Sequence, residues 1–234
     1  MPSAVTPTPL RIDFVSDVAC PWCAVGLAGL ERALDKLQGS VAVEMFFQPF
    51  ELNPAMPPEG EDMVEHIGRK YGSTPEQQEA NRAAIRERGA SVGFDFSPAG
   101  RGRIWNTFDA HRLIYWAGTE GHPADAQRRL KHAVLEAYHG RSLNPTDPQV
   151  LVDCAVQAGL DGARARAIVE SDEYADEVRE REAFFQQHGI TAVPSVIVNN
   201  QYLIQGGQPP EAFEQALRRI AEEGAQGGQA ASAV

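Results

Sequence analysis

The stretch Asp17-Val18-Ala19-Cys20-Pro21-Trp22-Cys23 joins a segment with the period of a strand to a segment with the period of a helix. Before it, apolar and charged residues alternate over 10–14, as in a half-buried strand. After it, leucines recur at helical spacing over 27–37, and Gly39 supplies a C-terminal stop. The sequence therefore predicts that Cys20 lies at the start of a helix that directly follows a strand.

A Cys-x-x-Cys pair in this position is suited to disulfide exchange. Unpaired N–H groups and the helix dipole stabilise a thiolate at Cys20, so we predict that Cys20 is the attacking thiol. Cys23 lies one turn further along, where it can form a disulfide with Cys20 and is more covered by protein, which suits a resolving thiol. Pro21 helps to start the helix, and Trp22 offers an apolar surface beside the reactive sulfur. We expect Pro21 and Trp22 to contact the substrate.

The alternative interpretation of the pair is half of a zinc site, which needs four Cys or His ligands. The chain has three cysteines and six histidines, and it has no second Cys-x-x-Cys. Cys154 is far away in an apolar helix without a histidine at ligand spacing, so it is interpreted as a small core residue. We therefore expect neither a metal site nor a structural disulfide framework.

The composition is that of a globular protein with a sizeable core, at 234 residues, 43% hydrophobic and 23% charged. A formal net charge of -11 disfavours nucleic acid and anionic membranes as partners. No secretory signal or membrane span is recognised, which predicts a cytoplasmic protein, although a mature form that had already lost its signal would look similar. No flavin or nicotinamide fingerprint occurs, so no cofactor is expected.

The order of predicted elements is strand, helix and strand, then helices, then a hairpin and a helix. Residues 41–48 are β-rich and complete a β-α-β unit. Over 61–188 the helix signals include the capping box Thr74-Pro75-Glu76-Gln77 and the pair Asp147-Pro148. This block predicts six or seven helices, with a loop or short turn within 91–103.

After the block, two short β-rich segments flank Asn199-Asn200, whose side chains tolerate the positive φ angles of a tight hairpin. Pro209-Pro210 opens a last helix that Gly224 is predicted to end. The predicted organisation is a discontinuous domain with a helical insertion and disordered tails. Its ranges are 10–60 and 189–224 for the domain, 61–188 for the insertion, and 1–9 and 225–234 for the tails.

Five segments resemble, in order and spacing, the FrnE-like branch of the DsbA family of dithiol oxidoreductases. The resemblance covers nearly the whole chain, from Leu10 to Glu223. The segments are Asp17 through Cys23, Phe50-Glu51-Leu52-Asn53-Pro54, Asn106 through Leu113, Val193-Pro194, and Gly206 through Pro210.

The resemblance implies an α/β thioredoxin fold, built as β-α-β then β-β-α, with a large all-helical insertion. It also implies a cis peptide bond before Pro194, beside the dithiol, where the backbone of Val193 would bind an extended substrate by strand addition. From the residues alone, Pro194 would be interpreted as an ordinary trans proline at the start of a strand.

The matched segments also contain Asn53, Asn106 and His111, which we treat as candidate residues of a substrate groove. His111 lies on a helix predicted over 104–117, and its alternative interpretation is a buried histidine with satisfied hydrogen bonds.

No general acid–base is assigned. Asp13 has the wrong strand parity for a buried acid beside the dithiol, because Phe14 occupies that face. Asp17 is nearer to the dithiol, but it is interpreted as a turn or cap residue.

The predicted function is thiol–disulfide exchange with protein or small thiol substrates, with glutathione as a candidate co-substrate and the direction of electron flow left open. The protein is expected to be a monomer or a homodimer. The second interpretation is a glutathione-dependent isomerase or transferase of the kappa class. Those enzymes carry a serine at the position of Cys20, so the two cysteines weigh against it. A third interpretation is a peptide-binding, chaperone-like module.

Overall fold

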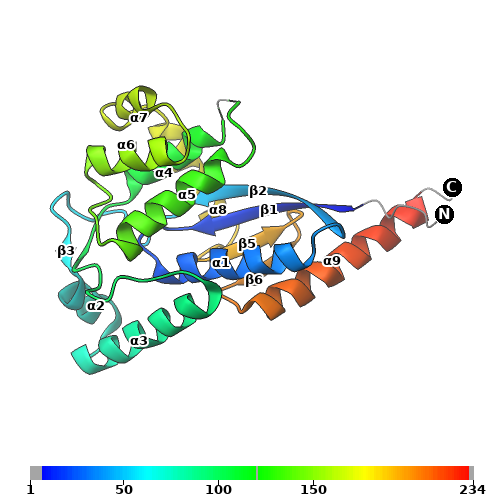
Figure 1. Ribbon diagram of the computed structural model, residues 1–234, viewed down its shortest axis with the longest axis horizontal. Coiled ribbons are helices and arrows are strands. Elements are labelled where there is room, and N and C mark those ends of the chain that lie inside the picture. Colours follow the sequence, from blue (N-terminus) through cyan, green and yellow to red (C-terminus); the bar gives the residue numbers. More distant parts are fainter. Residues whose placement is uncertain (1–6, 120, 232–234) are drawn as a thin grey trace.

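A four-stranded mixed sheet forms the centre of the computed structural model, which describes residues 7–119 and 121–231 (Figure 1). The strand order is β2-β1-β5-β6, with β1 parallel to β2 and antiparallel to β5, and β6 antiparallel to β5. This is the predicted arrangement of β-α-β followed by β-β-α. The strands are β1 (Thr8–Ser16), β2 (Val41–Pro49), β5 (Ser195–Val198) and β6 (Tyr202–Gln205).

Helices cover both faces of the sheet. Leu10, Ile12 and Phe14 of β1 are buried on the face that carries α1 (Pro21–Lys36) and α9 (Pro210–Ala231). Val15, of opposite parity, packs with Phe185 of α8 (Ala175–Gln187) in a smaller cluster. Successive side chains of a strand point to opposite faces of the sheet, so β1 contributes apolar residues to both clusters. Each face is then covered by helices.

The insertion between β2 and β5 contains seven α-helices in the part of the chain that is described, in agreement with the prediction. The capping box at Thr74 and the cap at Asp147 are both formed. Two features were not predicted, namely the two-residue ladder of β3 (Glu61–Asp62) with β4 (Arg103–Ile104) and the π-helix η1 (Glu136–Gly140). The helices are α2 (Met63–Tyr71), α3 (Pro75–Val92), α4 (Phe108–Ala117), α5 (Ala126–Leu135), α6 (Pro148–Gln157), α7 (Gly162–Val169) and α8.

Three predicted boundaries are wrong. The helix expected over 104–117 begins only at Phe108, because Ile104 pairs in β4 and Asn106 Oδ1 accepts the Phe108 N–H in a turn. Thr8 and Pro9 belong to β1 and not to a disordered tail. Helix α9 continues past Gly224 to Ala231, since one glycine costs a helix only about 1 kcal/mol relative to alanine. Of the remaining predicted tail residues, Pro7 belongs to no helix or strand, and residues 1–6 and 232–234 lie outside the described residues.

One large apolar core extends from the sheet into the insertion. It joins side chains of β1 and α1 to those of α4, α5, α6 and α7, and Trp116 and Tyr138 are its largest fully buried members. The predicted domain and insertion are successive parts of the chain. That they are separate structural units stays a prediction. No helix in the described part of the chain is long and apolar enough to cross a bilayer.

Candidate active site

Cys20 is the N-cap residue of α1, and Pro21 occupies the first turn, as predicted from the sequence. The Cys20 side chain is nearly buried, and Cys23 is completely buried one turn further along. Both are free thiols in this structure, and the Cys23 N–H donates to the Cys20 carbonyl at 3.1 Å. The pair therefore lies where the unpaired N–H groups of a helix start act on the first sulfur.

The two thiols differ in acidity. The hydrogen bond from the Cys23 thiol lowers the pKa of Cys20 by more than burial raises it. Burial raises the pKa of Cys23 well above the ordinary value of a thiol, and the adjacent Cys20 raises it further. Burial also raises the pKa of Cys154 to about 11. Cys20 is thus the sulfur that ionises most readily, which is the order expected of an attacking and a resolving thiol.

The segment before β5 lies directly against Cys20. The Val193-Pro194 bond is cis, which confirms the expectation from the family resemblance. The Cys20 thiol donates to the Val193 carbonyl oxygen at 3.6 Å. The side chain of Pro194 packs against the α1 backbone at Gly26. The two predicted residues of this segment are therefore brought to the reactive sulfur from 173 positions away in the sequence.

Asp17 organises the turn that precedes α1. Its carboxylate accepts the Ala19 N–H at 2.9 Å, the Leu52 N–H at 2.6 Å and the Thr107 hydroxyl at 2.8 Å. His111 Nε2 lies 3.5 Å from Asp17 Oδ1. Burial alone would raise the pKa of Asp17, but His111 and the backbone N–H groups together hold it below the ordinary value. The predicted turn role is correct, and Asp17 in addition ties two distant segments to the dithiol.

The three candidate groove residues have different places. Asn53 lines a cavity beside Cys20, whereas His111 is buried beneath the turn as the partner of Asp17. Asn106 forms a turn with Phe108. Among the described residues that line the cavity, neither Asn106 nor His111 is present.

The cavity beside Cys20 has a volume of about 300 Å³. Pro21 and Trp22 line it together with residues of helices α2 and α3. Their contact with a substrate stays a prediction.

Arg82 and Arg101 supply basic groups, and none of the described lining residues is acidic. Arg82 is paired with Glu79, and Arg101 donates to the Ala19 carbonyl. The cavity thus offers apolar surface and two arginines, one of them ion-paired, next to the reactive sulfur.

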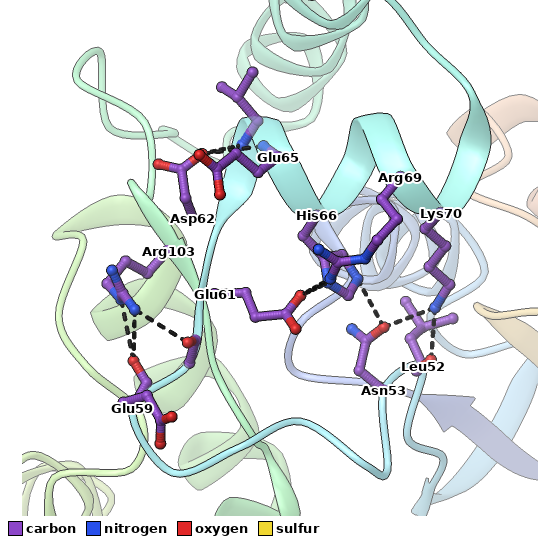
Figure 2. Close-up of polar contacts among 12 residues, drawn as sticks. Leu52, Asn53, Glu59, Glu61, Asp62, Glu65, His66, Arg69, Lys70 and Arg103 are labelled. Carbon is purple, nitrogen blue, oxygen red and sulfur yellow. Dashed lines mark hydrogen bonds and ion pairs between the residues drawn. The ribbon is translucent and has the colours of Figure 1, made fainter.

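A polar network fixes the wall that carries Asn53, as Figure 2 shows. Asn53 Oδ1 accepts from Lys70 Nζ at 2.7 Å and lies 3.0 Å from His66 Nε2. Lys70 also donates to the Leu52 carbonyl at 2.7 Å, and Glu61 contacts the other nitrogen of His66. Leu52 and Asn53 are therefore held by Asp17 through the Leu52 N–H, and by Lys70 and His66 of α2.

Two buried basic residues near the dithiol were missed by the sequence analysis. His139 of η1 is buried and contacts the Val18 carbonyl through Nε2 at 2.8 Å. Lys131 of α5 is 1% exposed, and the charges of Cys23 and Asp17 act on it. The signal for Lys131 was present, because it lies on the apolar stripe of its helix, three residues before Val134 and next to Leu130. No local pattern marked His139.

The described residues contain no group of three or more His, Cys, Asp or Glu side chains that could hold a metal ion. The cysteine pair therefore has no further ligands beside it in the described chain.

Comparisons with known proteins agree with this geometry. The family model of the DSBA-like thioredoxin domain matches residues 11–218. A probable DsbA oxidoreductase from Streptomyces coelicolor is 34% identical, with a TM-score of 0.81 over 90% of this chain and 89% of that chain. The Bacillus subtilis protein YwbO is 26% identical over 89% of this chain and 96% of its own length.

A more distant structure shares the fold. The cytosolic disulfide reductase DsbM from Pseudomonas aeruginosa, in its structure with GSH, is 13% identical, with a TM-score of 0.61 over 91% of this chain and 99% of that chain. The FrnE-like branch stays a prediction. Because the family model covers most of the chain and the dithiol, the cis proline and the helical insertion all occur in the expected order, the chain belongs to the DsbA-like thioredoxin-domain family.

Proposed function

We propose that the chain exchanges disulfides with protein or small thiol substrates, with Cys20 as the attacking thiol and Cys23 as the resolving thiol. The observation that carries the proposal is the unequal acidity of the two sulfurs at the start of α1, next to the Val193 carbonyl. A thiolate is the nucleophile in disulfide exchange, so the more acidic and more accessible sulfur reacts first.

In the reductive direction the Cys20 thiolate attacks one sulfur of the substrate disulfide. That S–S bond breaks, and half of the substrate leaves as a thiolate. Cys23 then loses its proton and attacks the Cys20 sulfur, which forms the Cys20–Cys23 disulfide and releases the second half as a thiolate. Two electrons pass from the dithiol to the substrate, and an external thiol must restore the dithiol. The same steps in reverse oxidise a substrate dithiol.

Two surfaces next to Cys20 suit two kinds of substrate. The backbone of Val193, together with Pro194, Pro21 and Trp22, would bind an extended peptide by strand addition. The cavity would accept a small anionic thiol such as glutathione, because Arg101 in its lining can interact with a carboxylate, whereas Arg82 is already paired with Glu79. The reductase from Pseudomonas, described as cytosolic and crystallised with GSH, supports both the glutathione proposal and a cytoplasmic location.

The test compares Cys20→Ser and Cys23→Ser with Cys154→Ala as the control that removes a buried thiol elsewhere. In an insulin reduction assay, Cys20→Ser should fall to the uncatalysed rate and Cys154→Ala should keep the wild-type rate. Cys23→Ser should accumulate mixed disulfides, with insulin chains or with glutathione, which mass spectrometry identifies. Wild-type activity in Cys20→Ser would exclude the dithiol mechanism and would favour the glutathione-dependent isomerase.

A further inference from the structure

The amide of Asn53 is held in one orientation beside the reactive cysteine. Its Oδ1 accepts from Lys70 Nζ at 2.7 Å and lies 3.0 Å from His66 Nε2. A lysine ammonium has only donors, so the amide atom that faces it must be the oxygen and not the nitrogen. His66 Nε2, the second neighbour of this oxygen, then also donates to it. The two contacts therefore exclude the flipped amide and use both lone pairs of Oδ1.

The nitrogen of the same amide is left open. Figure 2 shows both dashed lines of Asn53 at Oδ1 and none at Nδ2. Within residues 7–119 and 121–231, Nδ2 donates to no group, yet it is not one of the buried atoms that lack a partner. Asn53 is half-buried and lines the cavity beside Cys20. It thus presents one oriented N–H donor that a bound molecule can reach.

Short contacts place Asn53 next to Cys20. The N–H of Leu52, the residue before Asn53, donates to Asp17 Oδ2 at 2.6 Å. The other oxygen of Asp17 accepts the N–H of Ala19, the residue before Cys20, at 2.9 Å. One carboxylate thus joins the two segments, and Asn53 and Cys20 line the same cavity of about 300 Å³. That volume is at the lower end of small-ligand pockets, so a group that fills it contacts both residues.

The cavity is distinct from the segment before β5. Val193 and Pro194 are not among the described residues that line it, although the Val193 carbonyl contacts the Cys20 thiol. Strand addition to Val193 therefore leaves the cavity for another part of the substrate. Both substrate classes of the proposed function, polypeptides and glutathione, carry peptide carbonyl oxygens within a few bonds of their cysteine sulfur. A carbonyl oxygen is the complement of an open amide N–H.

We propose that Asn53 is a substrate-binding residue whose Nδ2 donates to a peptide carbonyl oxygen of the substrate. The inference rests on the proposed disulfide exchange and deepens it, because it names the group that is recognised. The hydrogen bond holds the substrate while the Cys20 thiolate attacks its disulfide, and it persists in the mixed disulfide that follows. Asn53 gives up no proton, and His66 and Lys70 keep its amide in this orientation. A substrate without a carbonyl group lacks this contact.

The experiment compares two small disulfides, N,N′-diacetylcystamine, which carries an amide carbonyl in each half, and cystamine, which carries none. Reduced protein is mixed with each disulfide and quenched in acid, and mass spectrometry after alkylation follows the loss of free Cys20 and Cys23. Asn53→Asp keeps the oxygen that His66 and Lys70 bind and replaces only the open N–H. It should slow the reaction with N,N′-diacetylcystamine about tenfold and should not slow that with cystamine.

Two further variants separate the hydrogen bond from the added charge. Asn53→Leu removes the donor without adding a charge, and it should lower the rate with N,N′-diacetylcystamine about tenfold relative to that with cystamine. Asn81→Asp is the matched control, because Asn81 also lines the cavity, takes part in no hydrogen bond within the described chain and receives the same charge. It should change the ratio of the two rates much less than Asn53→Asp does, since its amide is not held in place.

The outcomes separate two failures. If neither disulfide oxidises the dithiol of the parent protein, the proposed function fails. If both do, and Asn53→Asp and Asn53→Leu keep the parent ratio of the two rates, Asn53 binds no carbonyl group and this inference is overturned. Equal slowing with both disulfides, together with a lower temperature of thermal unfolding, would also overturn it, because a distorted cavity wall would explain it. The same conclusion would follow if Asn81→Asp changed the ratio as much as Asn53→Asp.

Discussion

At the residue scale, Asp17 acts on the dithiol in two ways that oppose each other. Its carboxylate accepts hydrogen bonds from Ala19, Leu52 and Thr107, and these bonds hold the turn in which Cys20 lies. Its negative charge raises the pKa of Cys20, although the hydrogen bond from Cys23 outweighs that effect. The same side chain therefore builds the site and moderates the acidity of its nucleophile.

This opposition leads to a prediction for Asp17→Asn. Loss of the charge should lower the pKa of Cys20, so that its rate of alkylation by iodoacetamide reaches half its maximum at a lower pH. The amide cannot accept all three hydrogen bonds, so the free energy of unfolding should fall by about 1–3 kcal/mol, the usual cost of a buried unpaired group. Mass mapping of the alkylated protein against pH, and urea unfolding, measure the two effects.

Asp13→Asn is the matched control, because Asp13 is also a buried carboxylate of this region but is paired with Arg11 and Gln48. It should leave the alkylation profile of Cys20 in place. A profile in Asp17→Asn that stays the same or moves to higher pH would contradict the assigned charge effect.

The residues of the site differ in how well the sequence could predict them. Cys20 and Cys23 are local to one motif, so their relation to the helix start follows from spacing alone. The bond from Asp17 to Ala19 is equally local, and the turn role was predicted. Its bonds to Leu52 and Thr107 reach 35 and 90 residues along the chain. No pattern within a single segment carries that information.

At the element scale, α1 approaches the segment before β5 so closely that a side chain is excluded. A Cβ atom on Gly26 would lie 3.0 Å from Pro194 Cγ and 3.3 Å from Gly207 Cα. Both distances are shorter than ordinary van der Waals contacts. Gly26 therefore allows the first turns of α1, which carry the dithiol, to pack directly on the segment that places Val193 beside Cys20.

We predict that Gly26→Ala separates these elements. Alanine favours a helix over glycine by about 1 kcal/mol, but the extra methyl group in this contact should cost about 1–3 kcal/mol. The expected result is unchanged or lower thermal stability, with a clear loss of insulin reduction, because the Val193 carbonyl moves away from Cys20. Thermal unfolding and steady-state kinetics measure the two quantities.

Gly68→Ala in α2 is the control, since its Cβ would meet no described atom closer than 3.5 Å. It should gain about 1 kcal/mol in stability and keep its activity. If Gly26→Ala instead gains stability and retains activity as Gly68→Ala does, the close approach has no functional role.

Elements defined by local chemistry were predicted, and those defined by tertiary contacts were not. The capping box at Thr74 and the hairpin at Asn199 and Asn200, both with φ of 53°, follow from side chains that act on their own backbone. The π-helix η1 depends on the Arg141 N–H bonding to the Glu136 carbonyl while His139 reaches the turn before α1. That second contact crosses 121 positions, so no window of sequence reveals it.

At the scale of the whole molecule, the insertion and the sheet share a core, and His139 is one of the polar links between them. The fold class followed from the order of elements and from the family resemblance. That the insertion packs continuously with α1 and the sheet did not follow, because amphipathic helices predict that a face is buried but not against which partner. The link at His139 makes the stability of this shared structure sensitive to pH.

The His139 ring is held in its neutral form. Nε2 donates to the Val18 carbonyl, so Nδ1 carries a lone pair, and Nδ1 has no partner among the described residues. A second proton would create a buried donor without an acceptor. Burial accordingly holds the pKa of His139 well below its usual range, and the nearby Arg101 charge lowers it further.

The consequence is a pH-dependent free energy of unfolding. Below about pH 6.5 the unfolded chain binds a proton at this histidine while the folded chain does not, so stability should fall as the pH decreases, by about 1.4 kcal/mol per pH unit from this group. His139→Gln keeps an amide that can donate to Val18 and does not titrate, so its stability should fall less steeply between pH 6.5 and 5. Urea unfolding at half-unit pH steps gives both slopes. If His139→Gln kept the full wild-type slope, the pH dependence of the free energy of unfolding would come from another group. A glutamine cannot bind the proton that His139 takes up on unfolding, so the contribution of His139 must be absent from that variant.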